Sequence, residues 1–245
     1  HNHHTLKEFF TIKGDFKKFC IFAFFFYFAV MIASPFFSVY MLKDLELSYS
    51  NFMLASALST IARIAAQQKI GKLTDKYGDK PIGLISVFGT AFVPLLFLFV
   101  TQQNLWLIIP AQILSGIVWA GADLALFNLL LDLTDPQKRA THVATYAMII
   151  SIPNIAAPLI GGLIADYASV WILTGIPLVF FSSFLLRLTS SLLLYAIKEP
   201  RAHKTYSMGY VLQHAFALHP SRGLEYRIKI FSKKIEPLRK KLHIL

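Results

Sequence analysis

Three ionisable side chains fall inside long apolar runs, and they are the residues of this chain best placed to do chemistry: Arg63, Asp123 and Arg187. A charge in the core of a bilayer costs ~3 kcal/mol or more, so such a residue usually has a charged partner or faces a water-filled cavity. We therefore treat these three residues as the first candidates for a functional site.

Asp123 is the most informative of them. It lies about eight residues from the nearer end of its apolar run, roughly 12 Å along a helix, which is too deep for a short carboxylate to reach the headgroups. Asp123 can therefore bind a cationic or hydroxyl-bearing solute, or exchange a coupled proton. The alternative is a structural carboxylate, neutralised by Arg63 or packed against a neighbour through Gly121 and Ala122.

The two arginines have simpler explanations. Arg63 is a few residues from Gln68 and Lys69, so its side chain can reach the membrane surface, although it can also pair with Asp123 or contact an anionic solute. Arg187 lies near the end of the last apolar run, and we expect it to anchor that helix at the headgroups.

These residues belong to a chain that is 56% hydrophobic and 15% charged, with 22 phenylalanines. A soluble chain would carry about a quarter charged residues. Windows that reach the ~20 residues needed to cross a bilayer cover residues 19–42, 49–68, 81–100, 105–131, 141–165 and 170–197. They lack the alternation of transmembrane strands, so we predict an all-α, polytopic transmembrane bundle of six spans.

Lysine and arginine predict the orientation of this bundle. They gather before the first span, between spans two and three, and between spans four and five, whereas the opposite loops contain one lysine. Positively charged short loops stay cytoplasmic, so both termini are predicted to be cytoplasmic. The predicted domains are a cytoplasmic N-terminal segment (1–18), a six-helix transmembrane domain (19–197) and a basic cytoplasmic tail (198–245).

The net charge of +11 is concentrated in this tail, which holds eleven Lys and Arg residues against three Glu. Within residues 227–245 the charges interleave with apolar residues, a pattern suited to an anionic lipid surface. The simpler alternative is a solvated tail that only fixes the topology. Neither interpretation calls for nucleic acid as a partner.

Residues 71–80 form a short basic connection between spans two and three. Gly71 and Gly78 permit tight turns, and Asp75 can face a helix N-terminus, where the helix dipole favours an anion. The segment resembles the signature loop of the major facilitator superfamily, Gly-x-Leu-x-Asp-(Arg/Lys)-x-Gly-(Arg/Lys)-(Arg/Lys). The matching residues are Gly71, Leu73, Asp75, Lys76, Gly78 and Lys80, while Asp79 replaces a basic residue.

Two other segments agree with this resemblance, which covers about residues 15–200. Pro158, Gly161 and Gly162 match the family's Gly-Pro-x-x-Gly-Gly helix-kink motif, with Ala157 in place of the first glycine. Residues 33–42 look like the seventh span of bacterial members. Gln112 stands where an N-terminal half usually has arginine. Because the chain also starts at His1 and ends in a charged tail, we expect a fragment or processed product equivalent to the C-terminal half, with 1–18 as the remnant of a central linker.

The resemblance implies a secondary transporter in the cytoplasmic membrane of a prokaryote, working by alternating access between two six-helix halves. Spans one and four would line the central cavity, spans two and five would meet the missing half or a second copy, and spans three and six would be peripheral. Solute-binding candidates are therefore Asp123, Arg63, Asn128, Trp119, Tyr40 and Asn154, together with Phe36, Phe37 and Phe127. Membrane lipid, a small solute and protons are the expected partners.

We see no catalytic triad, metal-ligand helix pair or phosphate loop, so we predict neither an enzyme nor a metal or cofactor site. Two alternatives to a half transporter stay open: a six-span scaffold or interaction subunit without transport activity, and a half-size transporter that works as a homodimer. The substrate, the direction of transport and the coupling ion do not follow from the residues.

Overall fold

The computed structural model describes residues 14–170, 173–199, 206 and 208–211. The chain divides into two units, residues 1–208 and 209–245, and the long helices belong to the first. The predicted lipid-binding stretch 227–245 lies outside the described residues. The helices are α2 (Asp15–Met31), α3 (Ser34–Val39), the π-helical turn η1 (Tyr40–Asp44), α4 (Tyr49–Tyr77), α5 (Asp79–Phe97), the 3-10 turn η2 (Leu105–Leu107), α6 (Ile108–Asp132), α7 (Arg139–Tyr167), α8 (Ile176–Tyr195) and α9 (Met208–Val211).

The predicted all-α membrane bundle is confirmed. Five segments of the described chain are long and apolar enough to cross a membrane: Asp15–Asp44, Asp79–Phe97, Leu105–Asp132, Arg139–Tyr167 and Ile176–Tyr195. Helix α4 corresponds to the second predicted span. Its 29 residues give it a length of about 43 Å, but polar residues such as Asn51 and Arg63 make it less apolar than the other five.

The first span is not one continuous helix. It breaks at residues 32–33 between α2 and α3 because Pro35 has no N–H to donate to the carbonyl of Met31, and its ring disfavours an unbroken helix. At the break, the N–H of Ala33 donates to Val30 rather than continuing the ladder to Ala29. The break leaves backbone carbonyl groups that need other donors.

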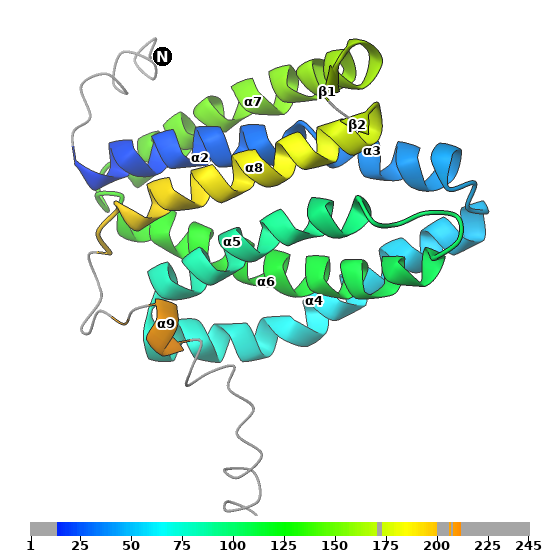
Figure 1. The fold of residues 1–245 in the computed structure, drawn as a ribbon. Coiled ribbons are helices and arrows are strands. Elements are labelled where there is room, and N and C mark those ends of the chain that lie inside the picture. Colours follow the sequence, from blue (N-terminus) through cyan, green and yellow to red (C-terminus); the bar gives the residue numbers. More distant parts are fainter. Residues whose placement is uncertain (1–13, 171–172, 200–205, 207, 212–245) are drawn as a thin grey trace, which may run out of the picture. The chain divides into compact units, whose positions relative to one another are not determined.

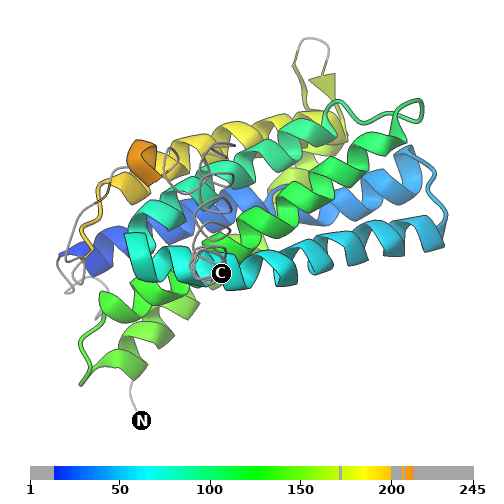
Figure 2. The ribbon, with the colours of Figure 1, turned by 90° about the horizontal axis from the view of Figure 1, so that it is seen from below.

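The helices of the first unit pack side by side (Figure 1). Helix α5 lies between α6 and α8, α2 contacts both α7 and α8, and α4 packs mainly on α6. The view turned by 90° shows the same neighbours (Figure 2). Two apolar clusters fill the interior. One contains the fully buried Phe19, Phe22 and Phe26 of α2, and the other contains Phe97 of α5 and Phe180 of α8.

A two-stranded antiparallel hairpin connects α7 to α8. Its strands are β1 (Ser169–Val170) and β2 (Leu173–Thr174), with Ser169 opposite Thr174. The last span therefore begins at Ile176, six residues later than its sequence pattern predicts. Apolar residues alone did not reveal this start, because Val170 and Leu173 suit a short strand as well as a helix.

Helices α4 and α7 are the least covered by the rest of the bundle. Only Ile70, Thr74 and Tyr77 are buried among the 29 residues of α4. In α7, 22% of the apolar window is buried, against 44% to 61% in the other four candidate spans. Each of these two helices thus presents a long face that the described part of the chain does not cover.

Candidate functional site

Asp123 on α6 forms an ion pair with Arg63 on α4. The two helices come close because α6 has a glycine at the crossing: a Cβ on Gly116 would lie 2.3 Å from the carbonyl oxygen of Ser59. The side chains of Arg63 and Asp123 are 48% and 37% exposed. The structure thus shows the pairing that the sequence left as one of several alternatives, and it places the pair at the edge of the bundle. A role for Asp123 in solute binding stays a prediction.

A cavity of about 300 Å³ lies between α2, α3, α5, α6 and α8. Apolar walls come from residues such as Phe37, Val93 and Phe97. Its polar lining consists of Tyr27, Ser34, Gln112, Ser115 and Arg187, and the predicted site residue Trp119 also lines it. This partly open space, with a few polar groups among apolar ones, has the composition of a small-molecule site.

Helix α6 connects this cavity with the ion pair. Gln112, Ser115, Trp119 and Asp123 follow one another at spacings of three and four residues, so they share one face of the helix. The first three line the cavity. On this face of α6, polar or amphipathic side chains therefore form a continuous line from the cavity to the carboxylate of Asp123. The sequence alone contained this spacing, but Ser115 did not stand out in an apolar run.

Arg187 is the residue that sequence reasoning placed wrongly. Instead of anchoring α8 at the headgroups, its side chain lies inside the bundle and is 2% exposed. Its Nη1 donates to the carbonyl of Thr90 on α5 at 2.9 Å, and its Nη2 donates to the carbonyl of Val30 on α2 at 3.4 Å. Its Nε has no hydrogen-bond partner among the described residues.

Both carbonyl groups lie close to a proline or to a helix break. The acceptor of Thr90 would normally bond the N–H of residue 94, and that residue is Pro94. Val30 stands at the break before α3, and its carbonyl accepts the N–H of Ala33 as well as Nη2 of Arg187. One turn before Arg187, the hydroxyl of Ser183 donates to the nearby carbonyl of Ala29 at 2.6 Å. Helix α8 thus supplies donors to the carbonyl groups of Thr90 and Ala29, which two proline-dependent irregularities have freed, and an unsatisfied group in the bilayer core would cost several kcal/mol.

The connection between α4 and α5 is much shorter than predicted. Helix α4 continues through Gly71 to Tyr77, and the turn is made by Gly78 alone, at a positive φ of 95° that suits glycine. Gly71 therefore makes no turn. Asp75 lies exposed in the last turn of α4 and does not cap the next helix. Leu73 and Lys76 also belong to this last part of α4.

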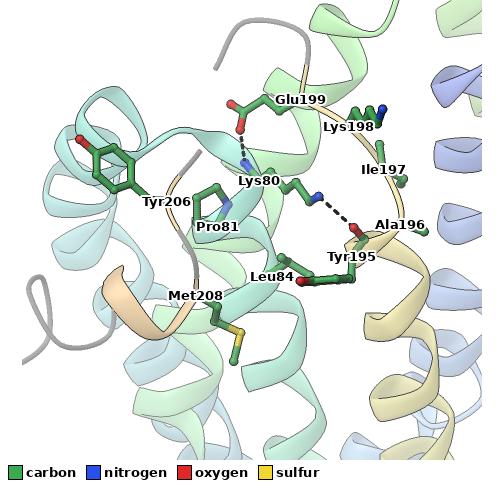
Figure 3. A pocket seen from close by; sticks show the side chains of 10 residues that line it. All are labelled: Lys80, Pro81, Leu84, Tyr195, Ala196, Ile197, Lys198, Glu199, Tyr206 and Met208. Atoms are coloured by element: carbon green, nitrogen blue, oxygen red, sulfur yellow. Dashed lines mark hydrogen bonds between the residues drawn. The ribbon is translucent and has the colours of Figure 1, made fainter. Parts of the chain in front are cut away.

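A carboxylate from beyond α8 caps α5 instead. Glu199 accepts the backbone N–H groups of Asp79 and Lys80 at 2.9 Å and 3.3 Å, and Figure 3 shows its contact with Lys80. The side chain of Lys80 donates to the carbonyl of Tyr195 at 2.9 Å, and its Nζ lies 5.3 Å from the centre of the Tyr195 ring. Lys80, Tyr195 and Glu199 line a pocket of about 600 Å³. Lys80 of the predicted signature loop thus joins α5 to the end of α8.

Asn128 also belongs to this region. Its side-chain amide on α6 donates to the carboxylate of Asp79 at 2.8 Å. The structure therefore brings Asn128 to the turn between α4 and α5 and not to the 300 Å³ cavity. Its partner Asp79 is the residue that departs from the signature-loop pattern.

The other predicted solute-binding residues are scattered. Tyr40 is buried and donates its hydroxyl to the carbonyl of Val100 at 2.8 Å, beyond the end of α5. Asn154 is exposed on α7. Phe37 lines the cavity and stacks on Phe180, whereas Phe127 is 58% exposed. Of the predicted set, Trp119 and Phe37 line the cavity.

The kink motif brings α7 against the break in the first span. A Cβ on Gly161 would lie 2.2 Å from the carbonyl oxygen of Ile32, so only glycine allows this approach. The neighbouring Gly162 has nothing within 4 Å of such a Cβ. Pro158 lies within α7, which the structure shows as one helix from Arg139 to Tyr167. In the described part of the chain, no group of three His, Cys, Asp or Glu side chains could hold a metal ion.

Comparison with known proteins agrees with this architecture. The family model of the Major Facilitator Superfamily matches residues 19–220. The chain therefore belongs to the major facilitator superfamily, a family of membrane transporters, and it is an integral membrane protein.

Among curated relatives, the class H tetracycline resistance protein of Pasteurella multocida is 35% identical over 101 residues, 41% of this chain and 24% of the relative. The class B tetracycline resistance protein of Escherichia coli is 27% identical over 113 residues, 46% and 27% of the two chains. The MFS-type transporter sphD of Aspergillus fumigatus is 31% identical over 131 residues, which are 50% of this chain and 22% of the relative. The matched part of this chain thus spans about a quarter of each relative's length.

Proposed function

We propose that this chain is the C-terminal half of a secondary transporter that moves a small solute by alternating access. The observation that carries the proposal is the half-exposed Arg63–Asp123 pair, which lies on membrane helices yet is not enclosed by them. A purely structural pair in a bilayer gains most when it is shielded from water and lipid. A pair at an open face suits a water-filled path, where one of its members can bind a solute or a proton.

The uncovered faces of α4 and α7 support a second half. In this proposal they meet six further helices, supplied by a missing N-terminal half or by a second copy of the chain. The small residues along α4 suit such packing, because helices in membranes associate through close backbone approach. Residues 1–18 would then lead from the other half, residues 19–197 would span the membrane, and both termini would be cytoplasmic.

The contacts around Gly78 support a conformational role for the signature loop. Asp79 bonds Asn128 of α6, while Glu199 bonds the start of α5 from beyond α8. Three helices are therefore joined at one end by a few polar contacts that a rocking motion can break and remake. Polar contacts at helix ends are suited to such switching, since water can replace them when they open.

Two of the relatives described above are named tetracycline resistance proteins, so tetracycline is the first solute to test. The experiment measures energy-dependent uptake of tetracycline into inverted membrane vesicles from cells that express the chain. Asp123→Asn removes the carboxylate and keeps its size. Asp166→Asn is the matched control, because Asp166 is exposed at the end of α7.

We expect uptake by the natural chain and by Asp166→Asn, and a loss of at least about tenfold with Asp123→Asn, the effect of removing a charged contact to a buried solute. Equal uptake by both variants would remove Asp123 from the mechanism. If neither this chain nor the chain paired with a second half accumulated any solute from a panel of drugs, a scaffold or interaction subunit would replace the transporter.

A further inference from the structure

Arg187 lies near the middle of α8, a helix long and apolar enough to cross a membrane. It is eight residues from the end of α8 at Tyr195 and eleven from its start at Ile176, or about 12 Å and 17 Å along the helix. Its side chain points into the bundle and not along the helix toward either surface, as its contacts with Thr90 and Val30 show. A guanidinium keeps its charge at any ordinary pH, so the bundle holds a cation at this depth.

The contacts of Arg187 do not balance that charge. Both acceptors are neutral backbone carbonyls. Neither of the ion pairs Lys18–Asp15 and Arg63–Asp123 involves Arg187, and no described carboxylate forms an ion pair with it. The Nε–H group is also buried, with no acceptor in the part of the chain that the structure describes. Buried charges in proteins are normally paired, because an unpaired one loses its hydration without compensation.

The cavity beside Arg187 has room for the missing partner. A volume of about 300 Å³ corresponds to roughly ten water molecules at ~30 Å³ each. Phe37, Val93 and Phe97 give it apolar walls, while Gln112 and Ser115 offer neutral hydrogen-bonding groups. The lining thus contains one cation, no described acid and a large apolar surface. A ligand that matches it has an apolar body of similar size and one anionic end.

We propose that this cavity is a binding site for a small organic carboxylate, with the anion held by the guanidinium of Arg187 and the apolar body held between α5 and α6. The two backbone contacts keep the guanidinium in place across α2, α5 and α8, and the free Nε–H becomes a donor to the bound oxygen after a small movement of the side chain. The assignment of this ligand as a transported solute rests on the proposed function. The binding itself does not.

The test uses the complete chain in detergent micelles and benzoate as the probe, because benzoate combines an aromatic body with one carboxylate. Benzyl alcohol, which has nearly the same shape and no charge, is the matched ligand. Binding is measured by equilibrium dialysis with radiolabelled ligands. We expect saturable binding of one benzoate per chain, with an affinity about tenfold or more higher than that for benzyl alcohol. A hydrogen bond between charged groups is strong enough to produce this difference in affinity.

Two variants locate the site. Arg187→Gln should abolish the preference for benzoate over benzyl alcohol. Because this change also removes support from two helices, Ser115→Leu provides a second test: it fills the cavity, keeps Arg187, and should weaken benzoate binding about tenfold by excluding the apolar body. Ser151→Leu, on the exposed face of α7, is the control and should bind benzoate normally.

Equal affinities for benzoate and benzyl alcohol would overturn the proposal, and so would undiminished benzoate binding by Ser115→Leu. The outcome is separate from that of the transport experiment. Benzoate binding by a chain that moves no solute would support the carboxylate site and contradict the transport function. Tetracycline uptake by a chain that binds no benzoate would support the transport function and contradict the carboxylate site.

Discussion

The guanidinium of Arg187 donates to the carbonyl oxygen of Thr90 at 2.9 Å, and that oxygen is the one that Pro94 leaves without its helical partner. The proline and the arginine are on different helices and 93 positions apart. The missing N–H of Pro94 explains why the carbonyl of Thr90 is free to accept the hydrogen bond of Arg187. Pro94 frees an acceptor in the second half of α5, and Arg187 supplies the donor from α8.

This relationship predicts an energetic coupling between Pro94 and Arg187. Arg187→Leu leaves the carbonyl of Thr90 unsatisfied, and this part of the change should lower the free energy of unfolding by about 1–3 kcal/mol, whatever is gained by removing the buried charge. In a chain that also carries Pro94→Ala, residue 94 can donate its own N–H to Thr90, so the same change should cost about 1 kcal/mol less. Denaturant unfolding of the four chains in detergent measures this double-mutant cycle. Additive effects would contradict the coupling.

Gly161 and Gly162 should respond oppositely to substitution by alanine. In Gly161→Ala the new methyl group would lie 2.2 Å from the carbonyl oxygen of Ile32, so α7 must move away, at a cost of about 1–3 kcal/mol. Gly162→Ala meets open space and gains up to about 1 kcal/mol of helix propensity. Thermal unfolding of the two variants beside the natural chain decides the matter. Similar melting temperatures for both variants would be inconsistent with the close contact.

Glu199 should stabilise the start of α5 although it lies 120 residues away in the chain. Glu199→Ala removes both acceptors of the cap, with an expected loss of about 1 kcal/mol. Glu199→Gln keeps one neutral oxygen and should lose less. Hydrogen exchange of the amides of Asp79 and Lys80 reports the cap directly and should accelerate in Glu199→Ala. Lys198→Ala, on the exposed neighbouring residue, serves as the control and should leave the exchange unchanged.

The position of Asp123 should be reached by water. The single described cysteine, Cys20, is buried, so Cys20→Ala provides a background without reactive thiols. In it, Asp123→Cys should react with a charged, water-soluble methanethiosulfonate reagent, because the carboxylate that it replaces is 37% exposed. Ser183→Cys is the matched buried position, at 0% exposure, and should react at least about a hundredfold more slowly, since a thiolate forms poorly in apolar surroundings. If Asp123→Cys reacted as slowly as Ser183→Cys, water would not reach the Arg63–Asp123 pair, as expected for a scaffold.

Local patterns in the chain were sufficient to predict the class of fold. Hydropathy over windows of about 20 residues reports burial in lipid, and this signal does not depend on which helices are neighbours. The signature loop was found for a similar reason: Gly78 needs a positive φ whatever surrounds it. Helix ends were less predictable. Helix α4 runs nine residues past Gln68 because polar residues such as Lys69 and Lys72 continue a helix well once it has left the membrane core.

The candidate site was only partly predictable. Asp123 and Arg63 stood out because charges are rare in apolar runs, and the structure brings them together. Asn128 and Tyr40 were predicted because of the spans on which they lie, without knowledge of which way their side chains point. In the structure they bond Asp79 and Val100 respectively. The rotation of a helix about its axis decides which side chains meet, and with apolar residues all round, the sequence of a membrane helix carries little information about that rotation.

The sequence by itself determined that this chain is a bundle of membrane helices with the loop and kink motifs of a transporter family, because composition and short-range spacing express lipid burial and turn geometry directly. The tertiary structure alone decided the role of Arg187, the cap supplied by Glu199 and the cavity beside α6. Each of these depends on contacts between residues far apart in the chain, where a freed carbonyl, an uncapped helix end or an unfilled volume on one helix meets a side chain from another.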